Sequence, residues 1–592
     1  MKRYLVTTAD ENTWPKEESI IFLGEWCKRY SRMSMWENLN ADIEPYHWDD
    51  RTKLYTDYLY LQGLYEKLLA DMAYKLNQIH SVEHSLHYWR ILIGPWLNYF
   101  THMLFDRWYM LKQVIEKGKV DSCMIYERPP ETLIPIDMDD FNQLFIEDAW
   151  NEMIYGQLIT VLWSNELLVE KIPIKQEDDS YYRESNNTYR NGWKKFLKKM
   201  TFSTIYNLSK LKARDDDYFL ISSSLPLKTE FQLQYKLGQF PKKWLSIPYS
   251  IIKKPCIQKR DWKLSVGELG DSFSKIASQM IPKHIPIAYL EGYGELVKKV
   301  DGVSWPKSPK LVFTSNAYSA DDLFKCWAAK KVENGAQLII GQHGGNFGMT
   351  PMASQEEHQI TIADKWVSWG WSDTKRKKII PIGNSKASTS KVKNNPEGHA
   401  LMVCMTLPRY SYYLYCVPIA GQWMQYFDDQ KRFLKALPND LCEKVLLRTY
   451  HKDYGWDQLD RWKNDMPNIR IDHGDSSFYK MLSDSRIFIG TYNATTYLEA
   501  LSLNIPTIVF WDQNYWEIKD QVKPIFLHLK KVKILHETPE KAAQHLVEIW
   551  GDIDQWWSRK EVQIARKKFC DTFSYTNDHL MQDYENLFKR LE

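Results

Sequence analysis

The chain has 592 residues, of which 44% are hydrophobic and 26% are charged, and this composition excludes disordered, collagen-like and highly charged proteins. Its 78 basic and 75 acidic residues give a net charge of +3, so we expect no nucleic-acid partner. The eight cysteines form no Cys-x-x-Cys pair, which argues against a disulfide framework or a thiolate zinc site and favours a reducing, cytoplasmic environment.

The first third of the sequence predicts the edge of an α/β sheet followed by a large block of helices. The expected elements are strands at 4–8 and 20–23 and helices at 54–79 and 82–116, the second helix broken near Pro95. Apolar residues recur every three or four positions in the first helix, as in an amphipathic helix. No sustained alternation of apolar and polar residues follows, so we predict a helical insertion at about 52–215.

Two features bear on membranes. The longest apolar stretch, at 91–105, is interrupted by polar residues and is too short to span a bilayer. The basic run Lys194-Lys195-Phe196-Leu197-Lys198-Lys199 is either a solvated face or a peripheral contact with an anionic inner membrane. We therefore expect a cytoplasmic protein, with peripheral inner-membrane contact as an alternative.

Strands and helices alternate in the second half of the sequence. We expect strands at 218–222, 310–314, 336–340, 400–406, 444–449, 468–472, 486–490 and 506–511, and helices at 418–436, 476–484 and 495–503. Alternating βα units predict parallel sheets whose ligands gather at the carboxyl ends of the strands. A linker-like stretch at 391–398 separates two such units, so we predict two Rossmann-like domains facing a cleft.

The strongest site motif begins at Gly490, where an apolar strand runs into a short loop that opens a helix. Thr491, Asn493, Thr495 and Thr496 supply hydroxyl and amide groups there, next to the positive end of the helix dipole. This pattern predicts a phosphate site. The alternative is a capping box, with Thr496 as the cap and Glu499 three residues on, which needs no ligand.

Two more strand ends carry polar side chains. His451 follows the strand at 444–449, and an imidazole beside the phosphate loop would stabilise a leaving phosphate. The glycine-rich loop at 341–348 follows another strand, and its glycines would let the backbone approach a ligand closely. The alternatives are an incidental surface histidine and a tight turn without a ligand. The loop residues that we single out are Gln342, His343, Gly344 and Gly345.

A general base is expected across the cleft. Glu25 lies at a strand end next to a tryptophan, and Asp49 or Asp50 lies in a polar aromatic loop. A carboxylate beside tryptophan can have a raised pKa and accept a hydroxyl proton, although an ion pair with Arg51 is an equal alternative for Asp49.

Two motifs have the spacing of metal-binding side chains. His80, Glu83 and His84 have the spacing of inverted zinc peptidases, and Asp137 and Asp139 have the spacing that holds a divalent metal against a diphosphate. Short patterns of this kind arise readily by chance, so we assign no metal and no cofactor. No dinucleotide or Walker motif is present.

Several motifs resemble a family of transferases encoded in bacterial O-antigen and surface-polysaccharide loci, and the match runs over most of the chain. The matching segments are 22–27, 45–51, 88–96, 341–345 and 490–496. More distantly, the second half is similar to GT-B glycosyltransferases that use CMP-activated acidic sugars, such as capsule Kdo transferases and bacterial sialyltransferases. His451 would match their histidine, although Lys452 replaces the following proline, and Thr495 and Thr496 would match their hydroxyl pair.

The resemblance implies a GT-B glycosyltransferase of surface-polysaccharide biosynthesis that moves a nonulosonic acid or Kdo from a CMP donor to a glycan or lipid-linked glycan, with inversion. In this view 1–395 binds the acceptor, 396–575 binds the nucleotide sugar and 576–592 is a C-terminal helix. Glu25, Asp49 and His343 would be catalytic, and His451, Gly490, Thr491, Asn493, Thr495, Thr496 and Glu499 would bind the nucleotide. The alternatives are a UDP- or GDP-sugar transferase, a CDP-polyol phosphotransferase, a zinc hydrolase and a non-catalytic scaffold.

Overall fold

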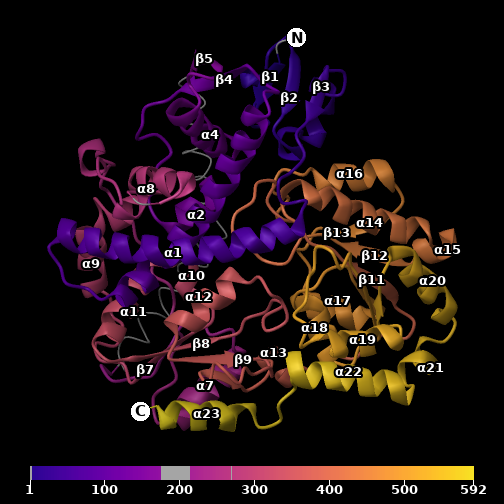
Figure 1. Cartoon of the computed structure of the whole chain (residues 1–592). Helices are drawn as coiled ribbons and strands as arrows, with labels where there is room; N and C mark the ends of the chain where they lie inside the picture. Colours follow the sequence, from indigo (N-terminus) through magenta and orange to yellow (C-terminus); the bar gives the residue numbers. More distant parts are fainter. Residues whose placement is uncertain (1–2, 175–213, 269, 592) are drawn as a thin grey trace.

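The computed structural model describes residues 3–174, 214–268 and 270–591. It contains three parallel sheets, one in each of three lobes, and the first two lobes together occupy one side of the molecule in Figure 1. One cluster of buried apolar side chains runs through all three lobes. The predicted α/β class is confirmed, but the part of the chain before the linker forms two sheets where we expected one.

The first sheet has the strand order β3-β2-β1-β4-β5. Its strands are β1 (Arg3–Val6), β2 (Ser19–Phe22), β3 (Ala41–Ile43), β4 (Ser122–Glu127) and β5 (Leu168–Pro173). Its helices are α1 (Arg51–His80), α2 (Leu86–Glu116), α3 (Met138–Leu144) and α4 (Asp148–Leu162). The predicted insertion therefore contains β4 and β5, so it is not wholly helical.

Helices α1 and α2 form a hairpin between the first and second lobes (Figure 1). Asp50 caps α1, because its carboxylate accepts hydrogen bonds from the Thr52 and Lys53 backbone N–H groups. Helix α2 continues through Pro95, so the expected break is wrong. Nearly every side chain of α2 is buried, against α4 of the first lobe and helices of the second.

The second sheet has the order β10-β9-β8-β7-β6. Its strands are β6 (Phe219–Leu220), β7 (Leu311–Thr314), β8 (Gln337–Gly341), β9 (Lys365–Ser368) and β10 (Ile379–Pro381). Its helices are α7 (Leu227–Lys236), α8 (Ser272–His284), α9 (Tyr293–Asp301), α10 (Ala317–Ala320), α11 (Asp322–Glu333), α12 (Ser354–Ile362) and α13 (Ser385–Thr389).

The third sheet has the order β13-β12-β11-β14-β15-β16. Its strands are β11 (His399–Val403), β12 (Val445–Arg448), β13 (Arg470–Asp472), β14 (Ser485–Gly490), β15 (Thr507–Phe510) and β16 (Leu535–His536). Its helices are α14 (Trp423–Lys435), α15 (Asn439–Cys442), α16 (Gln458–Asp465), α17 (Phe478–Asp484), α18 (Thr495–Ser502), α19 (Lys523–Lys531), α20 (Pro539–Ile549) and α21 (Ile553–Trp557).

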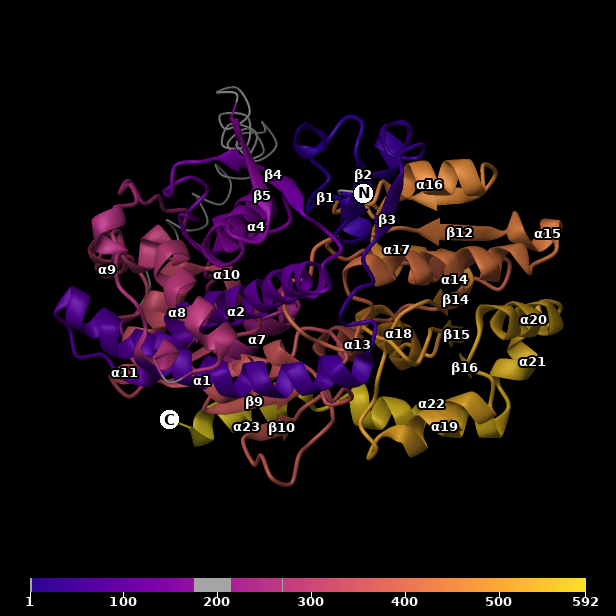
Figure 2. The ribbon, with the colours of Figure 1, turned by 45° about the horizontal axis from the view of Figure 1, so that its top comes forward.

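The last two helices cross from the third lobe to the second. Helix α22 (Lys560–Phe573) packs on α18 and α19, whereas α23 (Leu580–Arg590) packs on α7 (Figure 2). Backbone hydrogen bonds hold the crossing segment to the second lobe: Tyr575 N–H donates to Trp369 O at 2.7 Å, and Asn384 N–H donates to Tyr575 O at 2.8 Å. The second and third lobes are therefore joined by two segments, 391–398 and 574–579.

Candidate functional site

A cavity of about 230 Å³ lies between the second and third lobes. Five segments supply its walls: the loop after β8, the start of α12, the loop after β11, the loop between β14 and α18, and the loop after β15. These segments follow parallel strands, so their side chains meet at facing sheet edges, where ligands of α/β proteins bind. The lining residues are His343, Gly345, Asn346, Phe347, Ala353, Gln355, Glu356, Met405, Tyr413, Tyr415, Val417, Tyr492, Asn493, Ala494 and Trp516.

The first turn of α18 has no side-chain cap. The N-cap residue is Ala494, and the predicted cap Thr496 instead donates its hydroxyl to Tyr492 Oη at 3.1 Å. The capping-box alternative is therefore wrong. Backbone N–H groups at this helix start have no side-chain acceptor, which is the arrangement that binds anions.

Asn493 sits just before this helix start and lines the cavity. Its side chain is fully buried, and its Oδ1 accepts a hydrogen bond from Tyr497 Oη at 2.8 Å. Its Nδ2 has no hydrogen-bond partner among the residues that the structure describes. An unpaired buried amide is costly, so a donor that faces a cavity points to a ligand that accepts from it.

Gly490 and Thr491 lie deeper than we expected. The Thr491 hydroxyl donates to Val403 O at 2.8 Å and contacts Tyr426 Oη at 2.6 Å, and its side chain is 1% exposed. A Cβ at Gly490 would lie 3.0 Å from Val509. Both residues pack the end of β14 and neither lines the cavity.

The glycine-rich loop and the α18 start are in direct contact across the two lobes. Gly345 N–H donates to Thr495 Oγ1 at 2.8 Å. Gly344 has a φ of +157°, and a Cβ there would lie 2.4 Å from Thr495 Oγ1, so this approach requires glycine. The structure therefore brings together the two loops that the sequence singled out.

His343 lines the cavity, and its Nδ1 is buried without a partner. Burial, aided by the Lys386 charge, lowers the pKa of His343 to about 4, so the ring is neutral at pH 7. Gln342 stabilises the fold: its Oε1 accepts hydrogen bonds from Trp369 N–H at 2.9 Å and from Trp371 Nε1–H at 3.2 Å.

Glu356, which sequence reasoning missed, is the one carboxylate among the lining residues. It lies in the first turn of α12 and is 2% exposed. Its Oε2 accepts from Gly348 N–H at 2.7 Å, and Lys519 Nζ is 3.8 Å from its Oε1. Burial raises the pKa of Glu356 to about 7, although Lys519 opposes the shift.

Aromatic rings form another wall of the cavity. Tyr413 and Tyr415 follow β11 and are stacked at 4.5 Å, and Trp516 lies 6.4 Å from the Tyr492 ring. Such flat apolar faces suit a sugar or base ring. The cluster of tyrosines at 410–415 was the available sequence signal.

His451 and Glu499 lie near the cavity but do not line it. His451 is exposed at the end of β12, two strands from β14, and its ring is 4.4 Å from the Tyr450 ring. Glu499 is 4% exposed and lies 3.7 Å from Lys386 Nζ of α13. No hydrogen bond or ion pair joins either side chain to Asn493 within the described residues.

Glu25 and Asp49 lie at the interface between the first and third lobes, away from the cavity. Glu25 pairs with Lys28 at 3.0 Å, and Asp49 accepts a hydrogen bond from Gln422 Nε2 at 3.0 Å. Arg51 pairs with Glu517 at 2.7 Å, so the suggested Asp49–Arg51 pair is absent.

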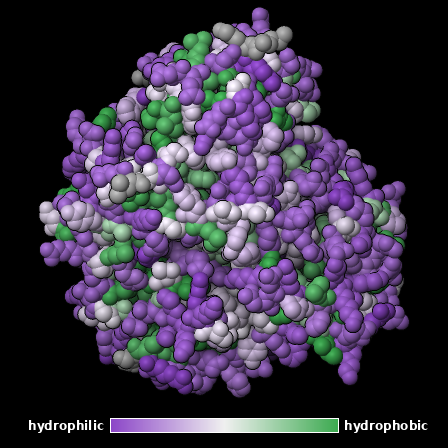
Figure 3. Space-filling view, viewed as in Figure 1, coloured by the Kyte–Doolittle hydropathy of each residue, from purple (hydrophilic) through white to green (hydrophobic). Residues whose placement is uncertain are grey.

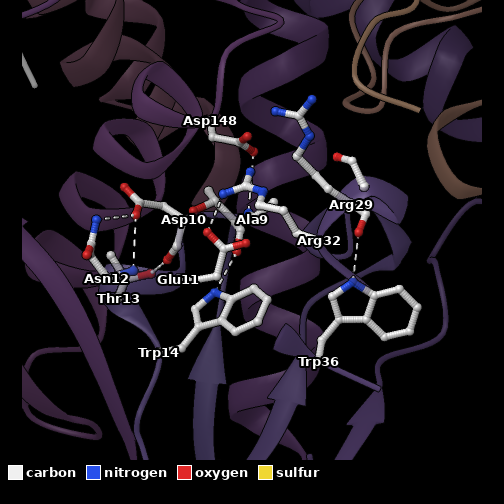
Figure 4. A network of polar contacts seen from close by, with 12 residues as sticks. Ala9, Asp10, Glu11, Asn12, Thr13, Trp14, Arg29, Arg32, Trp36 and Asp148 are labelled. Atoms are coloured by element: carbon white, nitrogen blue, oxygen red, sulfur yellow. Dashed lines mark hydrogen bonds and ion pairs between the residues drawn. The ribbon is translucent and has the colours of Figure 1, made fainter. Parts of the chain in front are cut away.

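The neighbouring carboxyl edge of β1 is filled by paired polar groups (Figure 4). Glu11 pairs with Arg32, Ala9 N–H donates to Asp148 at 3.4 Å, and Trp36 Nε1 donates to Arg29 O at 2.8 Å. These contacts fill the edge within the first lobe, and Arg29 also pairs with Asp457 of the third lobe at 3.4 Å.

The two metal-like motifs do not assemble. Helix α1 ends at His80, so His80 and His84 are not on one helical turn; His80 contacts Tyr289 O at 3.0 Å, and His84 pairs with Glu333 at 2.6 Å. Asp137 caps α3. Across 3–174, 214–268 and 270–591, no three His, Cys, Asp or Glu side chains form a metal-binding group.

Three observations concern the expected relation of the protein to a membrane. Within the described part of the chain, none of the helices has the length and apolar character to cross a bilayer. Figure 3 shows a mostly hydrophilic face with hydrophobic residues in small groups. The basic run at 194–199 lies outside the described residues.

The sequence matches the LIC12162 family transferase over residues 3–588. The chain belongs to this family. The LIC12162 family protein is thus a transferase, and no curated protein matches it.

Three solved structures have limited similarity to this family member. The wall teichoic acid polymerase TagF is 13% identical, covering 49% of this chain and 79% of its own, with a TM-score of 0.26. The UDP-forming α,α-trehalose-phosphate synthase from Burkholderia vietnamiensis is 8% identical, covering 55% and 79%, with a TM-score of 0.31. WaaG, a glycosyltransferase involved in lipopolysaccharide biosynthesis, is 9% identical, covering 50% and 94%, with a TM-score of 0.26.

Proposed function

We propose that this transferase is a GT-B-type glycosyltransferase that binds a nucleotide sugar in the cavity between its second and third lobes. The observation that carries the proposal is the uncapped start of α18, which contacts the glycine-rich loop through Thr495, next to Asn493, whose buried Nδ2 has no partner among the described residues. Backbone and amide donors of this kind stabilise a phosphate, and they continue to do so as a nucleotide leaves.

The cavity also suits the rest of such a substrate. The rings of Tyr413, Tyr415 and Trp516 offer stacking faces for a base or sugar. The neutral His343 adds a donor or acceptor without adding a charge. A leaving phosphate would be stabilised by backbone and amide dipoles, and Lys386, which lies 3.7 Å from Glu499, also acts on His343 through its charge.

For the donor, we propose a CMP-linked nonulosonic acid or Kdo, transferred to a surface-polysaccharide glycan with inversion. The support is the sequence resemblance carried by His451, Thr495 and Thr496. The Thr495 and Thr496 hydroxyls lie at the α18 start, and His451 lies at the same edge of the third sheet. The division into an acceptor-binding part before 395 and a donor-binding part after it is part of this proposal.

Isothermal titration of the full chain with CMP, UDP and GDP tests the donor. We expect CMP to bind at least tenfold more tightly than UDP or GDP, a difference of about 1.4 kcal/mol. A preference for UDP or GDP would overturn the CMP assignment but would not contradict the proposed glycosyltransferase function.

Product analysis tests the reaction class. Isotope-labelled CMP-sugars and CDP-polyols are incubated with lipid-linked glycan, and the product mass is measured. A glycoside supports the proposal, whereas a phosphodiester would identify a polyol-phosphate transferase. Absence of any transfer, together with absence of nucleotide binding, would contradict the assigned site.

A further inference from the structure

A transfer reaction in this cavity needs a group that accepts a proton. The oxygen of the acceptor hydroxyl forms a bond to the anomeric carbon, the bond from that carbon to the phosphate oxygen breaks, and the nucleotide leaves with the electron pair. The hydroxyl proton must then pass to a base within hydrogen-bond reach. Glu25 and Asp49 are engaged at another interface, so the base has to be sought among the lining residues.

We propose that Glu356 is the general base that removes this proton, an inference that rests on the proposed glycosyltransferase function. It is the one carboxylate lining the cavity, on the second lobe, opposite the uncapped start of α18 on the third lobe. The acceptor would then approach from one lobe while the phosphate is held by the other. The Gly348 N–H fixes Oε2, so Oε1, which lies 3.8 Å from Lys519 Nζ, is the oxygen that would take the proton.

The groups around Glu356 fit this role. Lys519 Nζ is 3.8 Å from Glu356 Oε1. The charge of Glu357 raises the pKa of Glu356, and the charge of Arg376 lowers it. The raised pKa of Glu356, about 7, matches a base that works near neutral pH. His343, with its pKa lowered to about 4, is a much weaker base.

The decisive variant is Glu356→Gln, because the amide oxygen can still accept from Gly348 N–H while the basic carboxylate is lost. We expect kcat with the labelled donor to fall about 10²- to 10⁴-fold, with CMP affinity within twofold of wild type. Glu356→Ala should be partly rescued by added formate. A Gln variant that keeps more than a tenth of wild-type kcat would overturn the assignment.

Glu357→Gln is the matched control. Glu357 is on the same helical turn but pairs with Arg376 at 2.9 Å and does not line the cavity, so its kcat should stay within about twofold. The wild-type rate should fall as the pH drops below about 7, since Glu356 becomes protonated. A Glu356→Gln variant that still shows this acid limb would contradict the proposal. Failure of the wild type to transfer any sugar would instead reject the glycosyltransferase itself.

Discussion

Asn493 places a buried amide nitrogen without a partner against a cavity, and this makes a sharp test possible. Asn493→Asp keeps an oxygen to accept from Tyr497 Oη but replaces the free donor with a negative charge. We expect CMP to bind at least tenfold more weakly, measured by isothermal titration, because the carboxylate repels phosphate. Asn464→Asp, on the surface of α16, is the control and should bind CMP as the wild type does. Equal affinities in both variants would remove Asn493 from the site.

Glu356 also makes stability depend on pH. Its pKa is about 7 in the folded protein against an ordinary value of 4.5, so the folded state binds more protons between these values. The free energy of unfolding should therefore fall as the pH rises from about 4.5 to 7, by on the order of 3 kcal/mol from this group. Urea unfolding of wild type and Glu356→Gln at pH 5 and pH 8 measures this change in the free energy of unfolding. The variant should gain stability relative to wild type at pH 8; an unchanged difference would contradict the shift.

The sequence predicted the position of some cavity residues but not of others. Asn493, His343 and Gly345 follow strands, and parallel strands bring their ends to one edge, so pattern alone located them at the cavity. Glu356 sits in the polar run Gln355-Glu356-Glu357-His358, which is typical of an exposed helix. Its burial depends on packing between two lobes, which local sequence does not encode.

Ala494 is the N-cap residue of helix α18, and its methyl side chain cannot cap the helix. Ala494→Asp should stabilise the helix, since a carboxylate at the N-cap accepts from the first-turn N–H groups and contributes about 0.5–2 kcal/mol. The same carboxylate would occupy the anion site. We therefore expect a higher Tm together with loss of CMP binding, measured by calorimetry. A variant that is more stable and still binds CMP would show that the helix start does not hold the phosphate.

Among the elements, strands of the first and second sheets were the hardest to predict. The sequence reading missed β3, β4, β5, β9 and β10. Most side chains of β5 are exposed or half-buried, so its pattern is not that of a buried parallel strand. The third sheet, whose central strands are apolar and evenly spaced by helices, was predicted almost completely.

At the scale of the whole molecule, one largely buried ion pair joins the first lobe to the third. Arg409 pairs with Asp148 at 2.7 Å. Burial alone would raise the pKa of Asp148, but the Arg409 guanidinium and Tyr410 hydroxyl outweigh burial and hold it below its ordinary value. Asp148→Asn leaves Arg409 as an unpaired buried cation, so we expect about 3–5 kcal/mol of destabilisation in urea unfolding at pH 7.

The destabilisation should shrink in acid, because the lowered pKa of Asp148 gives stability that is lost as the pH falls through its folded value. Asp571→Asn, which removes an exposed pair with Lys567, is the control and should change stability by less than about 1 kcal/mol. Equal effects of the two substitutions would mean that the Asp148–Arg409 pair does not help to hold the lobes together.

The chain passes between the second and third lobes twice, at 391–398 and again at 574–579. Two covalent connections limit how far the second and third lobes can move apart, and the Arg409–Asp148 pair also holds the third lobe to the first. A wide separation of the lobes during substrate entry would therefore have to break this pair. The Gly345–Thr495 hydrogen bond also joins the two lobes beside the cavity, so widening the cavity between them would have to break it.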